Sequence, residues 1–145
     1  MAYRYPVVLK REQGDNAYTV TFPDFPEGIT FGDTVGSALF AAVDCLDEVL
    51  ASRVHGNEKI PVPSKIRKYA VEPSIFVAAK VALFEAFGAA GMKKGALARL
   101  LDLNETEVRR MLDPYHPTKL SRIERALAAL GKRISIEVSD LHING

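Results

Sequence analysis

Residues 93–131 read KKGALARLLDLNETEVRRMLDPYHPTKLSRIERALAALG, and their apolar spacing predicts two short helices, a loop and a third helix. The apolar faces of the first two helices are formed by Leu97, Ala98, Leu101, Val108, Met111 and Leu112. Between these helices, Asp102 can adopt the left-handed conformation that ends a helix, and Asn104 can cap the next one. Two helices that pack across such a tight turn indicate a helix-turn-helix, which is a common DNA-binding unit.

The second of these helices, predicted at residues 105–112, would turn its polar side chains outward. Arg109 and Arg110 suit that face because a guanidinium can bond two acceptors on guanine or neutralise a phosphate. Nearby lysines would hold the DNA backbone. We therefore predict a DNA-binding surface formed by Lys93, Lys94, Glu105, Thr106, Arg109, Arg110 and Lys119.

The charge distribution supports this prediction. Residues 93–133 contain ten Lys and Arg against five Asp and Glu, a net charge of +5. Since the whole chain has a formal net charge of +1, the remainder carries −4. A basic segment attracts the phosphate backbone, so one end of the chain suits nucleic acid and the other does not. The amphipathic helices by themselves leave open a plain helical bundle with solvated charges.

The spacing in this segment resembles the lambda-repressor-like (XRE/Cro) helix-turn-helix family over roughly residues 75–131. Leu97 and Ala98 match the family's Leu-Ala pair, and Val108 matches the buried residue of its recognition helix. Asp102 departs from the pattern, because the family usually has glycine at the turn. The resemblance implies that residues 105–112 enter the DNA groove.

The first half of the chain alternates apolar and polar residues, which predicts strands. Residues 3–10 and 18–22 would form an antiparallel hairpin through a turn at residues 13–16. A bend at residues 23–28 and a short third strand at residues 29–31 follow. Thr34 would cap a helix to about Ser52, and a fourth strand is predicted at residues 68–72. The apolar stripe of that helix would be Leu39, Val43, Leu46 and Leu50.

Two further elements are predicted on either side of the basic segment. Residues 75–90 would form a buried apolar helix that begins after Ser74 and is too short to span a membrane. Ile134, Ile136 and Val138 alternate with polar residues and predict a C-terminal strand. This strand could pair within its own chain or with the same strand of a second subunit.

Three short motifs resemble the HicB antitoxin family: FPDFPEG at residues 22–28, TFGDT at residues 30–34 and IPVPS at residues 60–64. The order of the elements also matches, although Ile29 replaces a cysteine that the family often has. The resemblance implies a degenerate RNase H-like first domain that binds a HicA-like ribonuclease toxin, and a second domain that represses the operon. It implies no enzymatic activity and no cofactor.

The toxin-binding surface is predicted on the acidic bend and the first helix. Its candidate residues are Asp24, Phe25, Glu27, Asp44, Asp47 and Glu48. Acidic side chains would attract a basic toxin, and Phe25 on the bend would supply an apolar anchor. The alternative is that Phe25 packs into the core of its own domain.

Catalytic and metal sites are not predicted. Nuclease chemistry of the RNase H type needs several carboxylates around two metal ions, but the first two strands carry no acid between residues 3 and 10 or 17 and 22. His55, His116 and His142 have no second ligand at metal-binding spacing. The single Cys45 cannot form an internal disulfide and is expected to be buried.

The sequence as a whole predicts an α+β protein of two domains, residues 1–72 and 73–145. The first is a small antiparallel sheet with a packed helix, and the second is an all-α helix-turn-helix domain with a C-terminal strand. No signal peptide is evident, so we expect a cytoplasmic protein without a membrane partner. The expected partners are a HicA-like toxin, operator DNA, and further copies in a homodimer or higher even oligomer. Alternatives are a repressor with a ligand-binding first domain, and a nuclease.

Overall fold

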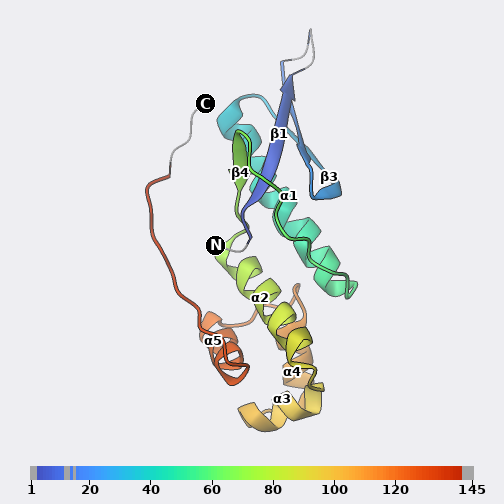
Figure 1. Ribbon diagram of the computed structural model, residues 1–145, viewed down its shortest axis with the longest axis vertical. Coiled ribbons are helices and arrows are strands. Elements are labelled where there is room, and N and C mark those ends of the chain that lie inside the picture. The colour runs from blue at the N-terminus through green and yellow to red at the C-terminus, as the bar shows by residue number, and fades with distance from the viewer. Residues whose placement is uncertain (1–2, 12–13, 15, 142–145) are drawn as a thin grey trace. The chain divides into compact units, whose positions relative to one another are not determined.

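The chain forms two compact units in the computed structural model, which describes residues 3–11, 14 and 16–141 (Figure 1). Unit 1 groups residues 1–50, 61–74 and 139–145, and unit 2 groups residues 51–60 and 75–138. The described elements are β1 (Tyr5–Arg11), β2 (Tyr18–Phe22), β3 (Phe25–Gly32), α1 (Val35–His55), β4 (Tyr69–Val71), α2 (Ile75–Ala90), α3 (Lys94–Leu101), α4 (Glu105–Leu112) and α5 (Leu120–Ala129). The α+β class is therefore confirmed. The domain limits at residues 72 and 73 stay a prediction.

Unit 1 contains a four-stranded antiparallel sheet with the strand order β3-β2-β1-β4. The predicted hairpin is confirmed, because β1 pairs with β2 and Leu9 lies opposite Val20. Residues 13 and 15 of its predicted turn lie outside the described residues. The third strand is longer than predicted, since β3 begins at Phe25 directly after a tight turn at Pro23 and Asp24. The RNase H-like description of this unit stays a prediction.

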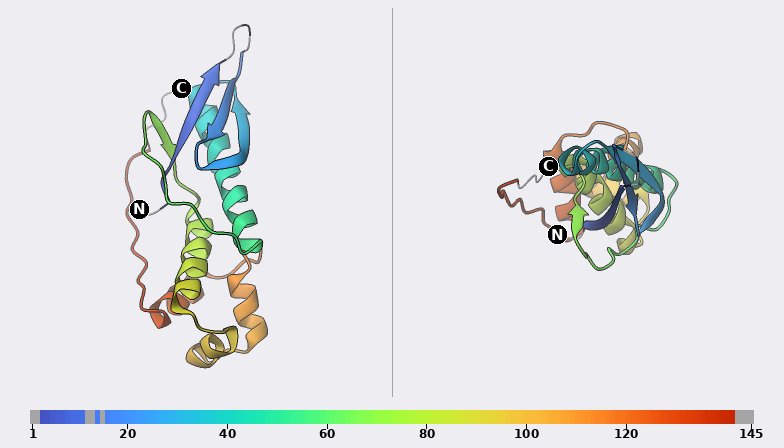
Figure 2. Two further views of the ribbon diagram at one scale, coloured as in Figure 1. Left: turned by 45° about the vertical axis from the view of Figure 1, so that its right-hand side comes forward. Right: turned by 90° about the horizontal axis from the view of Figure 1, so that it is seen from above.

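The inner face of this sheet is fixed by the alternation of side chains along each strand. Tyr5 and Val7 on β1 and Val20 on β2 are buried, whereas Val8, which follows Val7, is exposed. Helix α1 lies along one face of the sheet (Figure 2). Its fully buried side chains include Ala38, Ala42, Leu46 and Leu50. The predicted stripe is thus confirmed at its C-terminal end, while Leu39 and Val43 are half-buried because the small alanines face the core there.

The start of α1 is fixed by two features of the TFGDT motif. The predicted cap is confirmed, because the Thr34 hydroxyl accepts from the backbone N–H of Ser37 at 3.0 Å. The Ser37 hydroxyl accepts in return from the N–H of Thr34 at 2.9 Å. Gly32 lets the helix approach the strand, since a Cβ there would lie 2.3 Å from the backbone nitrogen of Ala38. Any larger residue would force β3 and α1 apart.

Unit 2 is built from α2, α3, α4 and α5 around one apolar cluster. Of the residues predicted to face inward from α3 and α4, five are confirmed as buried, namely Leu97, Ala98, Leu101, Val108 and Met111, and Leu112 is half-buried against them. Helix α2 adds Ala79, Leu83 and Ala86, and α5 adds Ile123, Ala126 and Leu127. Helices α3, α4 and α5 have only 8 to 10 residues, so their stability depends on this shared apolar burial rather than on helix propensity.

The predicted C-terminal strand is wrong for the described single chain. Residues 132–141 leave α5 as an extended segment without strand pairing (Figure 1). Ile134 is half-buried, but Ile136 is 61% exposed and Val138 is 91% exposed. A strand needs a neighbour to satisfy its backbone groups, and alternation in the sequence cannot supply one.

Helix α2 matches the predicted apolar helix at residues 75–90. Among the described residues, no single helix is long and apolar enough to cross a membrane. The pair α2 and α3 has sufficient length and composition only when taken together, and it is bent by 111°.

Candidate functional sites

The turn between α3 and α4 has the geometry that the sequence predicts. Asp102 ends α3 in the left-handed conformation, with φ 55° and ψ 46°. Asn104 begins α4, and its side-chain oxygen accepts from the N–H of Glu107 at 2.8 Å. The Glu107 carboxylate accepts in return from the N–H of Asn104 at 3.0 Å. This reciprocal capping box, which follows from the Asn-x-x-Glu spacing, fixes the first turn of α4.

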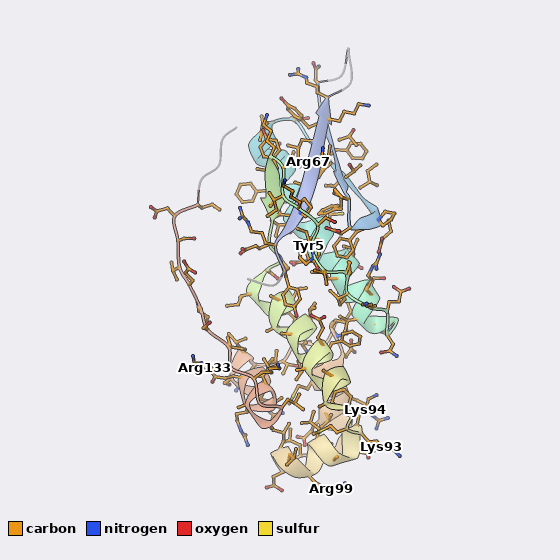
Figure 3. The ribbon with its side chains drawn as sticks, in the orientation of Figure 1. Tyr5, Arg67, Lys93, Lys94, Arg99 and Arg133 are labelled. Atoms are coloured by element: carbon orange, nitrogen blue, oxygen red, sulfur yellow. The ribbon has the colours of Figure 1, made fainter. Side chains whose placement is uncertain are left out.

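The predicted DNA-binding residues lie at exposed positions of unit 2. Lys93 is the N-cap residue of α3, and Lys94 begins the helix that also carries Arg99 (Figure 3). The remaining exposed members of the set are Glu105, Thr106, Arg109, Arg110 and Lys119. On α4, the Arg109 guanidinium donates to the Thr106 hydroxyl at 3.3 Å. The side chains that project from α4 are therefore mainly basic and hydroxyl groups.

Glu105 differs from the other predicted DNA-binding residues because its carboxylate lies against α3. A Cβ added at Gly95 would meet Glu105 Oε1 at 2.7 Å and Arg99 Nη1 at 3.8 Å. Gly95 thus leaves the space that this carboxylate occupies, close to a guanidinium. This position suits a contact between the two helices better than a contact with DNA.

Lys80 is a buried cation that connects α2 to the C-terminal end of α4. Its side chain is 1% exposed. Four oxygens lie within hydrogen-bond distance of the ammonium nitrogen: the carbonyl oxygens of Arg110 at 3.2 Å, Met111 at 2.8 Å and Asp113 at 2.9 Å, and the Thr118 hydroxyl at 2.8 Å. Because an ammonium has three N–H groups, the longest contact, to Arg110, shares a proton with one of the other three. The last carbonyls of a helix have no partner within the helix and carry partial negative charge, so a cation is well placed there.

The role of Lys80 was not predicted from the sequence. One charge within the apolar run IFVAAKVALFEAF is compatible with several packing arrangements. The sequence signal for this role is a single lysine inside an apolar helix, because a buried charge needs hydrogen-bond partners. The structure supplies those partners from a segment some thirty residues away, and it thereby holds α4 in place.

The acidic bend of unit 1 is held by hydrogen bonds within the fold. The Asp24 carboxylate accepts from the backbone N–H of Ser64 at 3.0 Å and from the Ser64 hydroxyl. The Tyr5 hydroxyl donates to the carbonyl of Pro61 at 2.7 Å. These bonds connect the FPDFPEG bend and β1 to the IPVPS segment, so they give two of the recognised motifs a structural role.

Phe25 is not an exposed anchor, and the prediction that placed it on the surface is wrong. Its side chain is 0% exposed and packs edge-on against Tyr5, with ring centroids 4.8 Å apart. Phe22 is a second aromatic neighbour, with ring centroids 6.3 Å apart. The physical reason is that Phe25 is the first residue of β3 and its side chain points to the inner face. The alternative of core packing is confirmed.

The other predicted toxin-binding acids divide into two groups. Asp47 is half-buried, and its carboxylate accepts from the N–H of Ser74 at 2.8 Å, just before α2 begins. Glu27, Asp44 and Glu48 are exposed. Cys45 lies between the two α1 acids, and its sulfur is 3.9 Å from the carbonyl of Ile29 on β3. This contact places that part of α1 beside β3.

An apolar patch on the outer face of the sheet was not predicted. Val8 is 50% exposed, Ile29 57% and Phe31 60%. In the ladder, Thr21 pairs with both Val8 and Ile29, so these side chains lie in one row across three strands. Apolar residues at several outward-facing positions of the strands are the sequence signal for this patch. An exposed apolar patch of this kind is typical of a surface that binds another molecule.

Metal binding and thiol chemistry receive no support from the part of the chain that is described. No group of three or more His, Cys, Asp or Glu side chains there could hold a metal ion. His142 lies outside the described residues. Cys45 is half-buried rather than fully buried, and burial raises the pKa of its thiol, so thiolate formation is disfavoured.

We predict that Lys80 makes the stability of the fold depend on pH. Burial lowers the pKa of its ammonium to about 8 from the ordinary 10.5, and the negative charge of Asp113 opposes that shift. Between these two values the unfolded chain holds a proton that the folded chain has released. The free energy of unfolding, measured relative to a Lys80→Met variant, should therefore rise from pH 8 to pH 10.5. Chemical denaturation of both proteins across this range checks it, and a falling difference would contradict it.

Comparison with known proteins places the chain in a family. Residues 4–82 match the model of the HicB-like antitoxin of bacterial toxin-antitoxin systems. Antitoxin HicB of Escherichia coli K12 is 36% identical over 135 residues, which cover 92% of this chain and 97% of the relative. Antitoxin HicB 2 of Photorhabdus laumondii is 37% identical over 133 residues, covering 92% and 94%. Antitoxin HicB of Pseudomonas fluorescens is 30% identical, covering 94% of both chains. The chain belongs to the HicB-like antitoxin family.

Proposed function

We propose that this protein is an antitoxin that binds and neutralises a HicA-like, mRNA-cleaving toxin and represses its own operon by binding operator DNA. The observation that carries the proposal is the match to proteins named antitoxin HicB along more than nine tenths of the chain. The two compact units, one with the acidic bend and one with the basic helices, support a division of these tasks.

DNA binding is assigned to unit 2 as a lambda-repressor-like helix-turn-helix. Helix α4 is the recognition helix in this proposal, and Arg109 and Arg110 contact bases or adjacent phosphates. Lys93, Lys94 and Lys119 bind the DNA backbone, together with Thr106. The left-handed turn at Asp102 and the buried Val108 support this assignment. Glu105 contacts α3 and helps to position α4, and it makes no direct contact with DNA in this proposal.

Toxin binding is assigned to the surface where α1 runs beside β3. Glu27, Asp44 and Glu48 are exposed there, and a basic ribonuclease would be attracted by them. Since Phe25 is buried, the exposed side chains of Ile29 and Phe31 supply the apolar part of the contact in this proposal. Asp24 and Asp47 shape this surface through their bonds to Ser64 and Ser74.

Neutralisation in this proposal is non-enzymatic and needs no metal or cofactor. The antitoxin covers the surface that the toxin uses for RNA, so inhibition is steric and electrostatic. A homodimer, or a higher even oligomer, places two recognition helices on the two halves of a symmetric operator.

The DNA-binding assignment predicts distinct effects for two kinds of basic residue. Replacing Arg110 by Ala should cost about 1–3 kcal/mol of operator binding if it makes a bidentate base contact. Lys94→Ala should weaken all sequences alike and reduce the salt dependence. Arg67→Ala, an exposed change in unit 1, is the control and should have little effect. The measurement is binding to the DNA upstream of the gene at several salt concentrations. Full affinity of an Arg109→Ala, Arg110→Ala protein would refute the assignment.

The toxin-binding assignment predicts that charge reversal on α1 weakens the complex. Asp44→Lys with Glu48→Lys should slow association with a co-expressed HicA-like toxin by about tenfold or more at low salt. Glu72→Lys is the control, because Glu72 is an exposed acid of the same unit outside α1, and it changes the net charge half as much as the double reversal. Association rates from surface plasmon resonance, measured at two ionic strengths, check this result. A control loss that is half as large or larger, on the logarithmic scale of the rates, would point to net charge alone and would exclude α1 as the contact.

A further inference from the structure

The buried Lys80 ammonium connects α2 to the start of α5 as well as to the end of α4. Its nitrogen lies 2.8 Å from the carbonyl oxygen of Met111, at the end of α4, and 2.9 Å from that of Asp113, in the loop that follows. The same nitrogen lies 2.8 Å from the hydroxyl of Thr118, and the next residue, Lys119, is the N-cap of α5. One nitrogen therefore fixes both ends of the loop between these two helices.

The loop at residues 113–119 has few ways to change shape between its two attachments. The Asp113 carboxylate accepts from the backbone N–H of Tyr115 at 2.9 Å, and the Asp113 carbonyl accepts from that of His116 at 3.2 Å. Pro114 and Pro117 restrict the backbone further, because their rings fix φ at about −65°. A shift of either attachment is therefore transmitted to the helix at the other end.

The proposed DNA contacts stand on both sides of this loop. Arg109 and Arg110 are exposed in the last turn of α4, and the Arg110 carbonyl lies 3.2 Å from the Lys80 nitrogen. Lys119 is exposed directly after Thr118. A bidentate contact with a base edge needs both hydrogen-bond distances within a narrow range, whereas attraction to a phosphate acts over a longer range. Base contacts therefore depend more strongly than phosphate contacts on where α4 lies.

We propose that Lys80 is a positioning residue for sequence discrimination, which holds α4 and the start of α5 at the spacing that base contacts require. This role rests on the proposed operator binding and names a residue that determines its specificity. The Lys80 side chain is 1% exposed, so it does not itself contact DNA. Thr118 shares the role, because its hydroxyl connects the ammonium to the start of α5.

A charge effect and a positioning effect predict different results for Lys80→Met. Met is also long and unbranched but has no charge, so this variant loses the hydrogen bonds while the exposed basic residues still attract phosphate. We expect its affinity for the operator to fall about tenfold, the order of one lost bidentate base contact. Its affinity for an unrelated duplex and the salt dependence should stay unchanged. Lys94→Ala is the contrasting control, because it should lower both affinities by the same factor.

Thr118 offers a test that changes no charge. Thr118→Val has nearly the same shape but no hydroxyl, whereas Thr118→Ser keeps the hydroxyl. Residue 118 is half-buried and lies outside the proposed DNA contacts. We expect Thr118→Val to lower the ratio of operator affinity to unrelated-DNA affinity, and Thr118→Ser to preserve it.

Fluorescence anisotropy measures both affinities for the unaltered chain and the four variants. The two labelled duplexes have equal length, one with the DNA upstream of the gene and one with a scrambled sequence. Thermal unfolding followed by circular dichroism identifies any variant that is not folded at the assay temperature. If Lys80→Met is unfolded there, the comparison of Thr118→Val with Thr118→Ser decides.

The outcomes distinguish failure of this role from failure of the proposed function. An unaltered chain that binds both duplexes alike would overturn operator recognition, and the role of Lys80 with it. Discrimination that is present in the unaltered chain and fully retained in folded Lys80→Met and Thr118→Val would overturn the role of Lys80 alone. An equal loss on both duplexes in these variants would also overturn it, because that result indicates a general structural or electrostatic effect.

Discussion

The hydrogen bonds of the Lys80 ammonium to the end of α4 fix the position of this helix against α2 within unit 2. Helix α4 has eight residues, which is too short to be stable by itself in water. The capping box fixes its first turn, and Lys80 binds the carbonyls at its last turn. The helix is therefore secured at both ends, by a turn next to it in sequence and by a lysine from α2. The capping box and the Lys80 hydrogen bonds therefore also determine where Arg109 and Arg110 are placed for any contact with DNA.

Unit 1 uses the same principle with the opposite charge. The Asp24 carboxylate binds Ser64 across forty residues of sequence, and Asp47 binds the backbone of Ser74. Acidic side chains that would suit a basic partner thus also hold loops in position. The proposed toxin-binding surface consequently combines acids that shape it with acids that remain exposed, namely Glu27, Asp44 and Glu48. A loss of binding after changing Asp24 would therefore report on the loop as much as on the contact.

Local signals in the sequence predicted the helices and caps well, because those elements depend on near neighbours. Helix α4 begins and ends at the predicted residues, and Thr34 and Asn104 cap their helices as expected. Properties that depend on distant partners were not predictable in this way. Phe25 is buried because it packs against Tyr5 and Phe22, and the partners of Lys80 come from the end of α4 and the loop after it. The C-terminal segment has the alternation of a strand, but pairing also requires a second strand.

A titration of ribonuclease activity tests the proposed neutralisation most directly. A HicA-like toxin would be purified alone and given a defined mRNA to cleave. Increasing amounts of the full-length chain would then be added. Our account predicts that cleavage stops near equimolar antitoxin, with formation of a stable complex. Cleavage that continues unchanged in an excess of the folded chain would contradict it.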